Sequence, residues 1–219
     1  MKKGVLFDLD GTLWDATAAL VAPWNEVIHR HGDIRPPLTQ ADMAGFMGKT
    51  AAQIAAMLLP GHPLQAGLES VYESCEVELP VLRERGGILY PHLKETLHLL
   101  GNLYPLYIVS NCQEGYIQAF LAHHHLEDMF ADFEYEGRTH LTKGENIRLV
   151  MERHALAQAV YVGDTQGDLD AAGAAGIPFI HAAYGFGKVD PSIPAAASPK
   201  QLPKLVARFL GGQMGQGNN

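Results

Sequence analysis

The sequence predicts an α/β fold: a doubly wound parallel sheet core with an inserted all-helical cap. In the second half of the chain, short apolar runs alternate with amphipathic helical stretches, as in sheets built from strand-helix-strand units. One further apolar run, Val5-Leu6-Phe7, stands near the start. Between these two regions the sequence has helical patterns and no strand pattern, so we expect a helical segment to interrupt the core.

The first strand is predicted at residues 5–7, because this run ends at an acid-rich turn at residues 8–12. Three helices should follow, since apolar residues recur three and four positions apart around Trp24, Ile54 and Val71. Prolines and glycines at residues 32–37 and 60–61 end the first two helices. The end of the third stays open, because Pro80 lies ahead of the glycines at residues 86–87.

The core is predicted to resume near residue 87 with a helix at Leu93, Leu97 and Leu100. Strands are then expected at residues 105–110, 159–163 and 177–180, with helices between them and a closing helix at residues 200–210. These elements predict a Rossmann-like core of residues 1–14 and 87–212. The helical cap is residues 15–86, and residues 213–219 are a disordered tail.

Composition narrows the class of protein. Apolar residues make up 47% and charged residues 18%, which is globular composition. The 24 acidic residues outnumber the 16 Lys and Arg residues, which disfavours a nucleic-acid partner. No apolar stretch is long enough for a membrane span or a signal peptide. With only two cysteines, no disulfide framework is implied, and we expect a cytoplasmic protein, either a monomer or a homodimer.

Reactive side chains follow three of the predicted strands. Ligands bind beyond the carboxyl ends of the strands in an open α/β sheet, so groups placed there converge on one edge. Lys143 stands at a predicted helix start between the later strands. The side chains at the strand ends are Asp8 and Asp10, then Ser110, then Asp164 and Asp168.

Four motifs resemble those of the haloacid dehalogenase-like (HAD) superfamily, and they occur in the family's order. Residues 7–13, Phe-Asp-Leu-Asp-Gly-Thr-Leu, resemble the first motif, and Val109-Ser110-Asn111 resembles the second. Lys143 resembles the third, and residues 163–168 resemble the fourth. The helical insertion after the first motif resembles the small α-helical cap of the phosphoglycolate phosphatase-like branch. The resemblance therefore implies a phosphatase.

The resemblance also implies roles for the two acids of the first motif. Asp8 would be the nucleophile that attacks phosphorus to give an aspartyl-phosphate. Asp10, two residues further on, emerges on the same side of an extended chain. It would protonate the leaving oxygen and later deprotonate the attacking water. Dehalogenases and phosphonatases of the family place no acid at this position, so Asp10 favours phosphatase chemistry.

Acids crowded around an anionic phosphate require a cation. Hard oxygen ligands without a Cys or His cluster indicate Mg²⁺. The resemblance implies ligation by the side chains of Asp8 and Asp164 and by the Asp10 backbone carbonyl, with Asp168 supporting them. The candidate phosphate-binding residues are Ser110, Asn111, Lys143 and Thr12, which lies in the sharp turn.

Other polar residues carry weaker predictions. Lys49 lies beside a Gly turn before a helix, where it could touch the substrate or equally be solvated. The tract His123-His124-His125 should be a solvated helix end, because consecutive helical residues point in different directions. Cys112 is interpreted as a small buried residue without a catalytic role, because the sequence reveals no histidine partner for its thiol. Residues 184–188 could form a loop near the rim of the site, but an ordinary Gly-rich turn is the favoured interpretation.

The predicted function is Mg²⁺-dependent hydrolysis of a small phosphomonoester, phosphoglycolate-like or a sugar phosphate, through an aspartyl-phosphate. The partner is thus a small phosphorylated metabolite, with neither nucleic acid nor membrane. A sugar phosphomutase of the same branch is the first alternative. A non-catalytic phosphate-binding protein is the second, and the four intact motifs disfavour it. A helical cap should also obstruct a folded phosphoprotein substrate.

Overall fold

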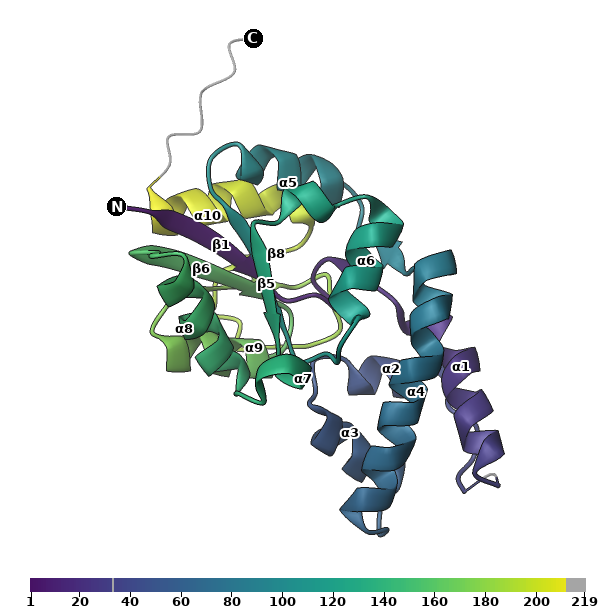
Figure 1. Cartoon of the computed structure of the whole chain (residues 1–219). Helices are drawn as coiled ribbons and strands as arrows, with labels where there is room; N and C mark the ends of the chain where they lie inside the picture. Colours follow the sequence, from purple (N-terminus) through teal and green to yellow (C-terminus); the bar gives the residue numbers. More distant parts are fainter. Residues whose placement is uncertain (33, 212–219) are drawn as a thin grey trace.

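The computed structural model describes residues 1–32 and 34–211, and within them six strands form one sheet. The sheet order is β5-β4-β1-β6-β7-β8, and every neighbouring pair is parallel (Figure 1). The chain winds outward in both directions from β1, which confirms the predicted doubly wound α/β fold. The strands are β1 (Lys3–Phe7), β4 (Leu106–Ser110), β5 (Asp132–Tyr135), β6 (Gln158–Gly163), β7 (Phe179–Ala182) and β8 (Ala195–Ala196).

Helices cover both faces of the sheet. Side chains alternate along a strand, so Val5 and Phe7 of β1 join one hydrophobic cluster while Leu6 joins another. The first cluster is closed by α5 (Leu93–Gly101), α6 (Tyr116–His124) and α10 (Leu202–Leu210). The second is closed by α8 (Lys143–Arg153) and α9 (Gln166–Ala175) on the opposite face (Figure 1). A short helix, α7 (Glu136–Thr139), follows β5.

Four helices follow one another between residues 16 and 86 of the chain, and we call them the helical insertion. They are α1 (Thr17–Arg30), α2 (Gln40–Phe46), α3 (Ala51–Leu58) and α4 (Leu64–Arg85). α4 packs against both α1 and α3 and also contacts α6 of the core. Among the described helices, none is both long enough and apolar enough to cross a membrane.

The two ends of the helical insertion are joined by a small antiparallel ladder. β2 (Trp14–Asp15) pairs with β3 (Ile88–Leu89). The chain therefore leaves and re-enters the core at one place. This places the helical insertion within the predicted cap range of residues 15–86.

Several strands and helices were not predicted, or were predicted with other bounds, and the sequence shows why. β5 is an edge strand that reads Asp-Phe-Glu-Tyr, so it lacks a continuous apolar run. α2 is short, although the reciprocal cap between Thr39 and Asp42 is a start signal that the sequence carries. α4 continues through Pro80, which is exposed. The paired part of β7 begins after Pro178, which has no N–H. The predicted tail, residues 213–219, lies outside the described residues.

The histidine tract is not simply a solvated helix end. His125 is exposed at the end of α6, but the His124 ring packs edge-on to Trp14, with 5.7 Å between ring centroids. Burial lowers the pKa of His124 to about 4, with the charge of His123 acting in the same direction. His124 is therefore a neutral packing residue beside the connection at β2.

One acid in the helical insertion is buried without an ion-pair partner among the described residues. Glu78 of α4 is 3% exposed, and its carboxylate accepts a hydrogen bond from the indole Nε1 of Trp24. Burial raises the pKa of Glu78 from 4.5 to about 8. The folded protein thus holds this proton more tightly than the unfolded chain does.

Glu78→Gln is expected to stabilise the protein at alkaline pH. An acid whose pKa is higher in the folded protein than in the unfolded chain contributes its full stabilisation below the pKa of the unfolded chain. This contribution is lost as the pH rises through the pKa of the folded protein. The free energy of unfolding of the variant should match that of the wild type at about pH 5 and exceed it by on the order of a few kcal/mol at about pH 8. Urea unfolding at both pH values measures this. Glu76→Gln, at an exposed position of α4, is the control. If the free energies of unfolding of Glu78→Gln and wild type changed in parallel with pH, the expectation would be refuted.

Candidate active site

The predicted reactive groups meet at the carboxyl edge of three adjacent strands. β1 lies between β4 and β6 in the sheet. Asp8 directly follows β1, Ser110 ends β4, and Asp164 directly follows β6. All three side chains are buried. The structure therefore brings together residues that lie far apart in the sequence, at the switch point where α/β sheets bind ligands.

Lys143 links the first and fourth motifs. Its Nζ donates to Asp8 Oδ1 at 2.9 Å and to Asp168 Oδ1 at 2.6 Å. Burial acts to lower the pKa of Lys143, but the charges of Asp168 and Asp8 outweigh it and raise the pKa well above its ordinary value. The lysine is the first residue of α8, where Thr142 and Glu145 form a reciprocal cap. A permanent positive charge is thus fixed beside Asp8.

Asp168 is held at both of its oxygens. Its Oδ1 faces Lys143, and its Oδ2 accepts hydrogen bonds from Thr165 N at 2.9 Å and Thr165 Oγ1 at 2.7 Å. The contacts with Thr165 form the reciprocal cap that starts α9. The same side chain therefore ends the turn after β6 and orients the lysine.

The segment at residues 184–188 contacts the site and is not an ordinary turn, which corrects the favoured sequence interpretation and agrees with the alternative of a loop near the site. The backbone N–H groups of Phe186 and Gly187 donate to Asp164 Oδ2 at 2.8 and 3.2 Å. A Cβ on Gly185 would lie 2.2 Å from the Gly11 carbonyl oxygen. Gly11 itself has φ of 78°, and a Cβ there would lie 2.3 Å from Asp164 Oδ2. Both glycines are needed because two loops press against one carboxylate.

The acids at the sheet edge fit a hard divalent cation. Asp8, Asp164 and Asp168 each offer a carboxylate oxygen within 4.8 Å of the others. Asp8 Oδ2 and Asp164 Oδ1 are buried and have no hydrogen-bond partner among the described residues. Burial, and then the charge of Asp168, raise the pKa of both Asp8 and Asp164 to about 7. Unpartnered carboxylate oxygens with raised pKa values are what a bound cation satisfies.

Asp10 is oriented by two aromatic residues that the sequence analysis missed. Its Oδ1 accepts hydrogen bonds from Trp14 Nε1 and from the Tyr116 hydroxyl, each at 2.9 Å. Burial and then the charge of Asp8 raise the pKa of Asp10 to about 7, while the two hydrogen bonds act to lower it. A carboxyl group with a pKa near neutrality can both give and accept a proton.

The predicted phosphate-binding residues occupy different environments. Ser110 is 4% exposed, and the Asn111 side chain donates from Nδ2 to the Gly48 carbonyl at 2.9 Å. Asn111 therefore ties the core to the helical insertion. The Thr12 backbone N–H donates to Leu9 within the turn, and the Thr12 hydroxyl is buried with no partner in the described part of the chain.

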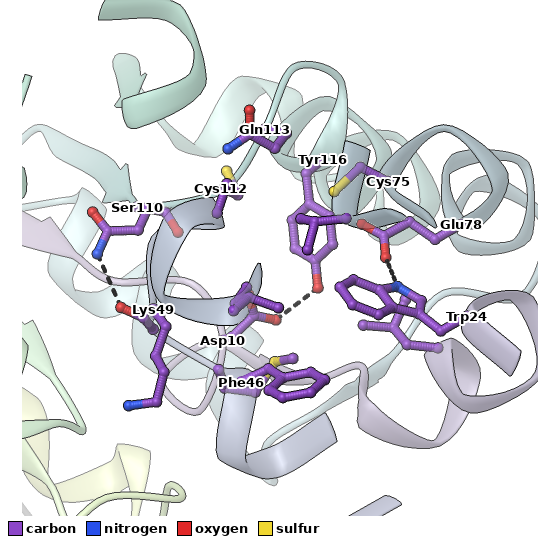
Figure 2. Close-up of a pocket in the computed structure, with 17 residues that line it drawn as sticks. Asp10, Trp24, Phe46, Lys49, Cys75, Glu78, Ser110, Cys112, Gln113 and Tyr116 are labelled. Carbon is purple, nitrogen blue, oxygen red and sulfur yellow. Dashed lines mark hydrogen bonds between the residues drawn. The ribbon is translucent and has the colours of Figure 1, made fainter. Parts of the chain in front are cut away.

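A pocket lies where the helical insertion meets the core (Figure 2). It holds about 530 Å³ including its solvent-open part, which is the size of a small-molecule site. Lys49 lines it, as do Asp10, Ser110 and Asn111. Cys112 also lines it, half-buried rather than buried, and burial raises the pKa of its thiol well above the ordinary value. The thiol therefore stays protonated near neutral pH, and a thiol is a far weaker nucleophile than a thiolate.

A parallel sheet with buried acids, a fixed lysine and a hydroxyl at one edge defines a class of enzyme that acts on phosphate groups. Comparison with known proteins identifies the family. Residues 5–182 match the model of the haloacid dehalogenase-like hydrolases, and the chain belongs to this family. The motif resemblance seen in the sequence is thereby confirmed.

Individual relatives agree with this assignment. The chain is 31% identical over 202 residues to a phosphoglycolate phosphatase of Rhodobacter capsulatus, covering 86% of this chain and 87% of that one. It is 28% identical over 201 residues to one of Aliivibrio fischeri, with the same coverage. A haloacid dehalogenase-like hydrolase from Bacteroides fragilis superposes with a TM-score of 0.78 at 26% identity, covering 92% of this chain and 100% of that one. The protein is a phosphoric monoester hydrolase.

Proposed function

We propose that this phosphatase hydrolyses a small phosphomonoester in two steps, with the phosphoryl group carried on Asp8 between them. The observation that carries the proposal is the Asp8 carboxylate. One oxygen is held by Lys143, and the other is buried and unpartnered among the described residues. The relatives' name suggests phosphoglycolate as substrate, and the predicted branch also allows sugar phosphates. Both are small phosphomonoesters.

In the first step, Asp8 Oδ2 attacks phosphorus and the bond from phosphorus to the ester oxygen breaks. Asp10 gives its proton to that oxygen, and the alcohol leaves. Ser110 and Lys143 hold the phosphoryl oxygens in line, since positioning and charge neutralisation supply most of the catalysis in phosphoryl transfer.

In the second step, Asp10 is a carboxylate and accepts a proton from water. The water oxygen attacks phosphorus, the bond between Asp8 and phosphorus breaks, and inorganic phosphate leaves. Both carboxyl groups then return to their starting states. The hydrogen bonds from Trp14 and Tyr116 keep Asp10 pointing toward the reacting oxygen in both steps.

We further propose that the cation is Mg²⁺, held by the side chains of Asp8 and Asp164 and the backbone carbonyl of Asp10. Asp168 supports this set through its contact with Lys143. When bound, the ion supplies the positive charge that lets a phosphate dianion approach several acids.

Metal removal is the test of the proposed function. Treatment with a chelator should abolish phosphate release from para-nitrophenyl phosphate, and added Mg²⁺ should restore it. Asp164→Asn should raise the Mg²⁺ concentration needed for half-maximal activity by about tenfold or more. Exposed Asp170→Asn is the control. Full activity after chelation would refute the metal requirement, and isomerised sugar phosphate in place of free phosphate would reveal a mutase.

Tyr116→Phe is expected to lower kcat/KM by about tenfold, because a hydrogen bond to a charged group contributes about 1.5–3 kcal/mol. In the wild type, the Tyr116 hydroxyl stabilises the ionised form of Asp10. Without this hydrogen bond the pKa of Asp10 should rise, and the alkaline limb of the pH profile of kcat/KM should shift to higher pH. Tyr104→Phe is the matched control, since its buried hydroxyl has no partner among the described residues. An unchanged pH profile in Tyr116→Phe would contradict the assigned contact.

A further inference from the structure

The pocket has an acid at its apolar end. Glu78 and Trp24 line it together, joined by the hydrogen bond from the indole (Figure 2). The neighbouring lining from the helical insertion is apolar: Leu20, Phe46, Ile54 and Val71. No described Lys, Arg or His side chain forms an ion pair with Glu78. The deep end therefore combines a hydrophobic wall with a hydrogen-bond acceptor that lacks a cation.

The positively charged side chain that lines the pocket, Lys49, lies away from Glu78. Lys49 is the single basic residue among the described residues that line it. Figure 2 shows Lys49 across the pocket from Glu78, with its ammonium directed away from Glu78 and Trp24. The preceding residue, Gly48, accepts the hydrogen bond from Asn111 of the second motif. Lys49 is thus associated with the phosphate end, where Ser110 and Asn111 lie.

The pocket thus has a lysine at its phosphate end and an acid among apolar residues at the other end, and this arrangement determines which organic groups fit. With phosphate at the Asp8 edge, the rest of the ester extends along Asp10 and Tyr116 toward Trp24 and Glu78. A carboxylate placed there would give up its hydration between apolar walls without a cation to neutralise it, which costs far more than burying a hydrogen-bonded hydroxyl. Glu78 is largely protonated near neutral pH because burial raises its pKa to about 8. Once Glu78 ionises at higher pH, repulsion between like charges adds to this cost. A hydroxyl or an amine instead donates a hydrogen bond to Glu78.

We propose that the preferred substrate is a small phosphomonoester whose organic part carries no carboxylate and offers a hydrogen-bond donor, a hydroxyl or an amine, to Glu78. This inference rests on the proposed phosphatase function and narrows it. It sets the protein apart from the relatives named for phosphoglycolate, and it makes Glu78 a specificity-determining residue of the helical insertion.

Three two-carbon esters that differ only in their far group provide the test: hydroxyethyl phosphate, phosphoethanolamine and phosphoglycolate. With Mg²⁺ present, kcat/KM for the hydroxyl or the amine ester should exceed that for phosphoglycolate by about tenfold or more. Comparing the first two substrates shows which donor Glu78 accepts. Para-nitrophenyl phosphate is included as a general phosphatase substrate.

The variants Glu78→Gln and Glu76→Gln make the test specific to the buried acid. Glu78→Gln keeps an acceptor for Trp24 but cannot ionise. The ratio between the donor ester and phosphoglycolate should therefore stay level in the variant from about pH 7 to about pH 9, whereas the wild-type ratio should rise by about threefold or more as Glu78 ionises. Glu76→Gln, exposed on the same helix, should keep the wild-type ratio. A change in KM rather than in kcat for the two-carbon esters places the effect on substrate binding.

The outcomes separate this inference from the function on which it rests. Phosphoglycolate as the best of the three substrates, or a ratio that changes with pH in the same way in Glu78→Gln and wild type, would overturn the role of Glu78 while the phosphatase stands. No phosphate release from any ester, including para-nitrophenyl phosphate, would instead overturn the proposed function itself.

Discussion

Asp8→Asn is expected to lower kcat by about 10⁴-fold or more, because an amide cannot form the acyl phosphate that carries the phosphoryl group. Phosphate release from para-nitrophenyl phosphate measures the loss. The substitution also removes one of several buried negative charges, so the variant should unfold at the same temperature as wild type or higher in the absence of metal. Lys143 keeps its contact with Asp168.

A matched control separates chemistry from folding. Asp170→Asn changes an acid that is exposed on α9, the helix that follows Asp164, and it should retain wild-type turnover. Activity of Asp8→Asn within about tenfold of wild type would place the nucleophile elsewhere, because loss of a nucleophile normally costs several orders of magnitude.

Asp10→Asn is expected to lower kcat on an alkyl phosphate by about 10²- to 10⁴-fold, the range for removal of a general acid-base residue. The asparagine Oδ1 can still accept from Trp14 and Tyr116, so the loop should keep its position. An aryl leaving group needs less protonation, and the first step on para-nitrophenyl phosphate should therefore be partly spared. The second step still lacks its base, so the phosphorylated enzyme should accumulate.

This difference between substrates has a direct readout. Rapid mixing of Asp10→Asn with para-nitrophenyl phosphate should give a burst of nitrophenol close to one per enzyme, followed by a slow steady rate. An equal loss on alkyl and aryl esters, with no burst, would contradict the assignment of both proton transfers to Asp10.

The sequence was sufficient for features that are encoded locally. The run at residues 5–7 and the acids after it predicted β1 and the first motif, and the pattern around Lys143 predicted the start of α8. The ends of the predicted strands then placed Asp8, Ser110 and Asp164 at one sheet edge, where the structure has them. Strand ends are predictable because alternation and sheet topology determine which groups share an edge.

Contacts between distant segments could not be predicted. Tyr116 reaches Asp10 across 106 positions of the chain, and an aromatic residue at a helix start indicates only a core position. The Phe186 and Gly187 amides reach Asp164 from a loop whose glycines predicted only a turn. Glu78 resembled any acid on a helix until the packing of α4 against α1 buried it beside Trp24. These positions depend on which surfaces meet after folding.

The covalent step at Asp8 is tested most directly by locating the phosphoryl group on the protein. Asp10→Asn mixed with para-nitrophenyl phosphate and Mg²⁺, then quenched in acid, should gain the mass of one phosphoryl group on the peptide that contains Asp8. The double variant with Asp8→Asn should gain none. A phosphoryl group on another residue, or none on Asp10→Asn during a nitrophenol burst, would contradict the proposed mechanism.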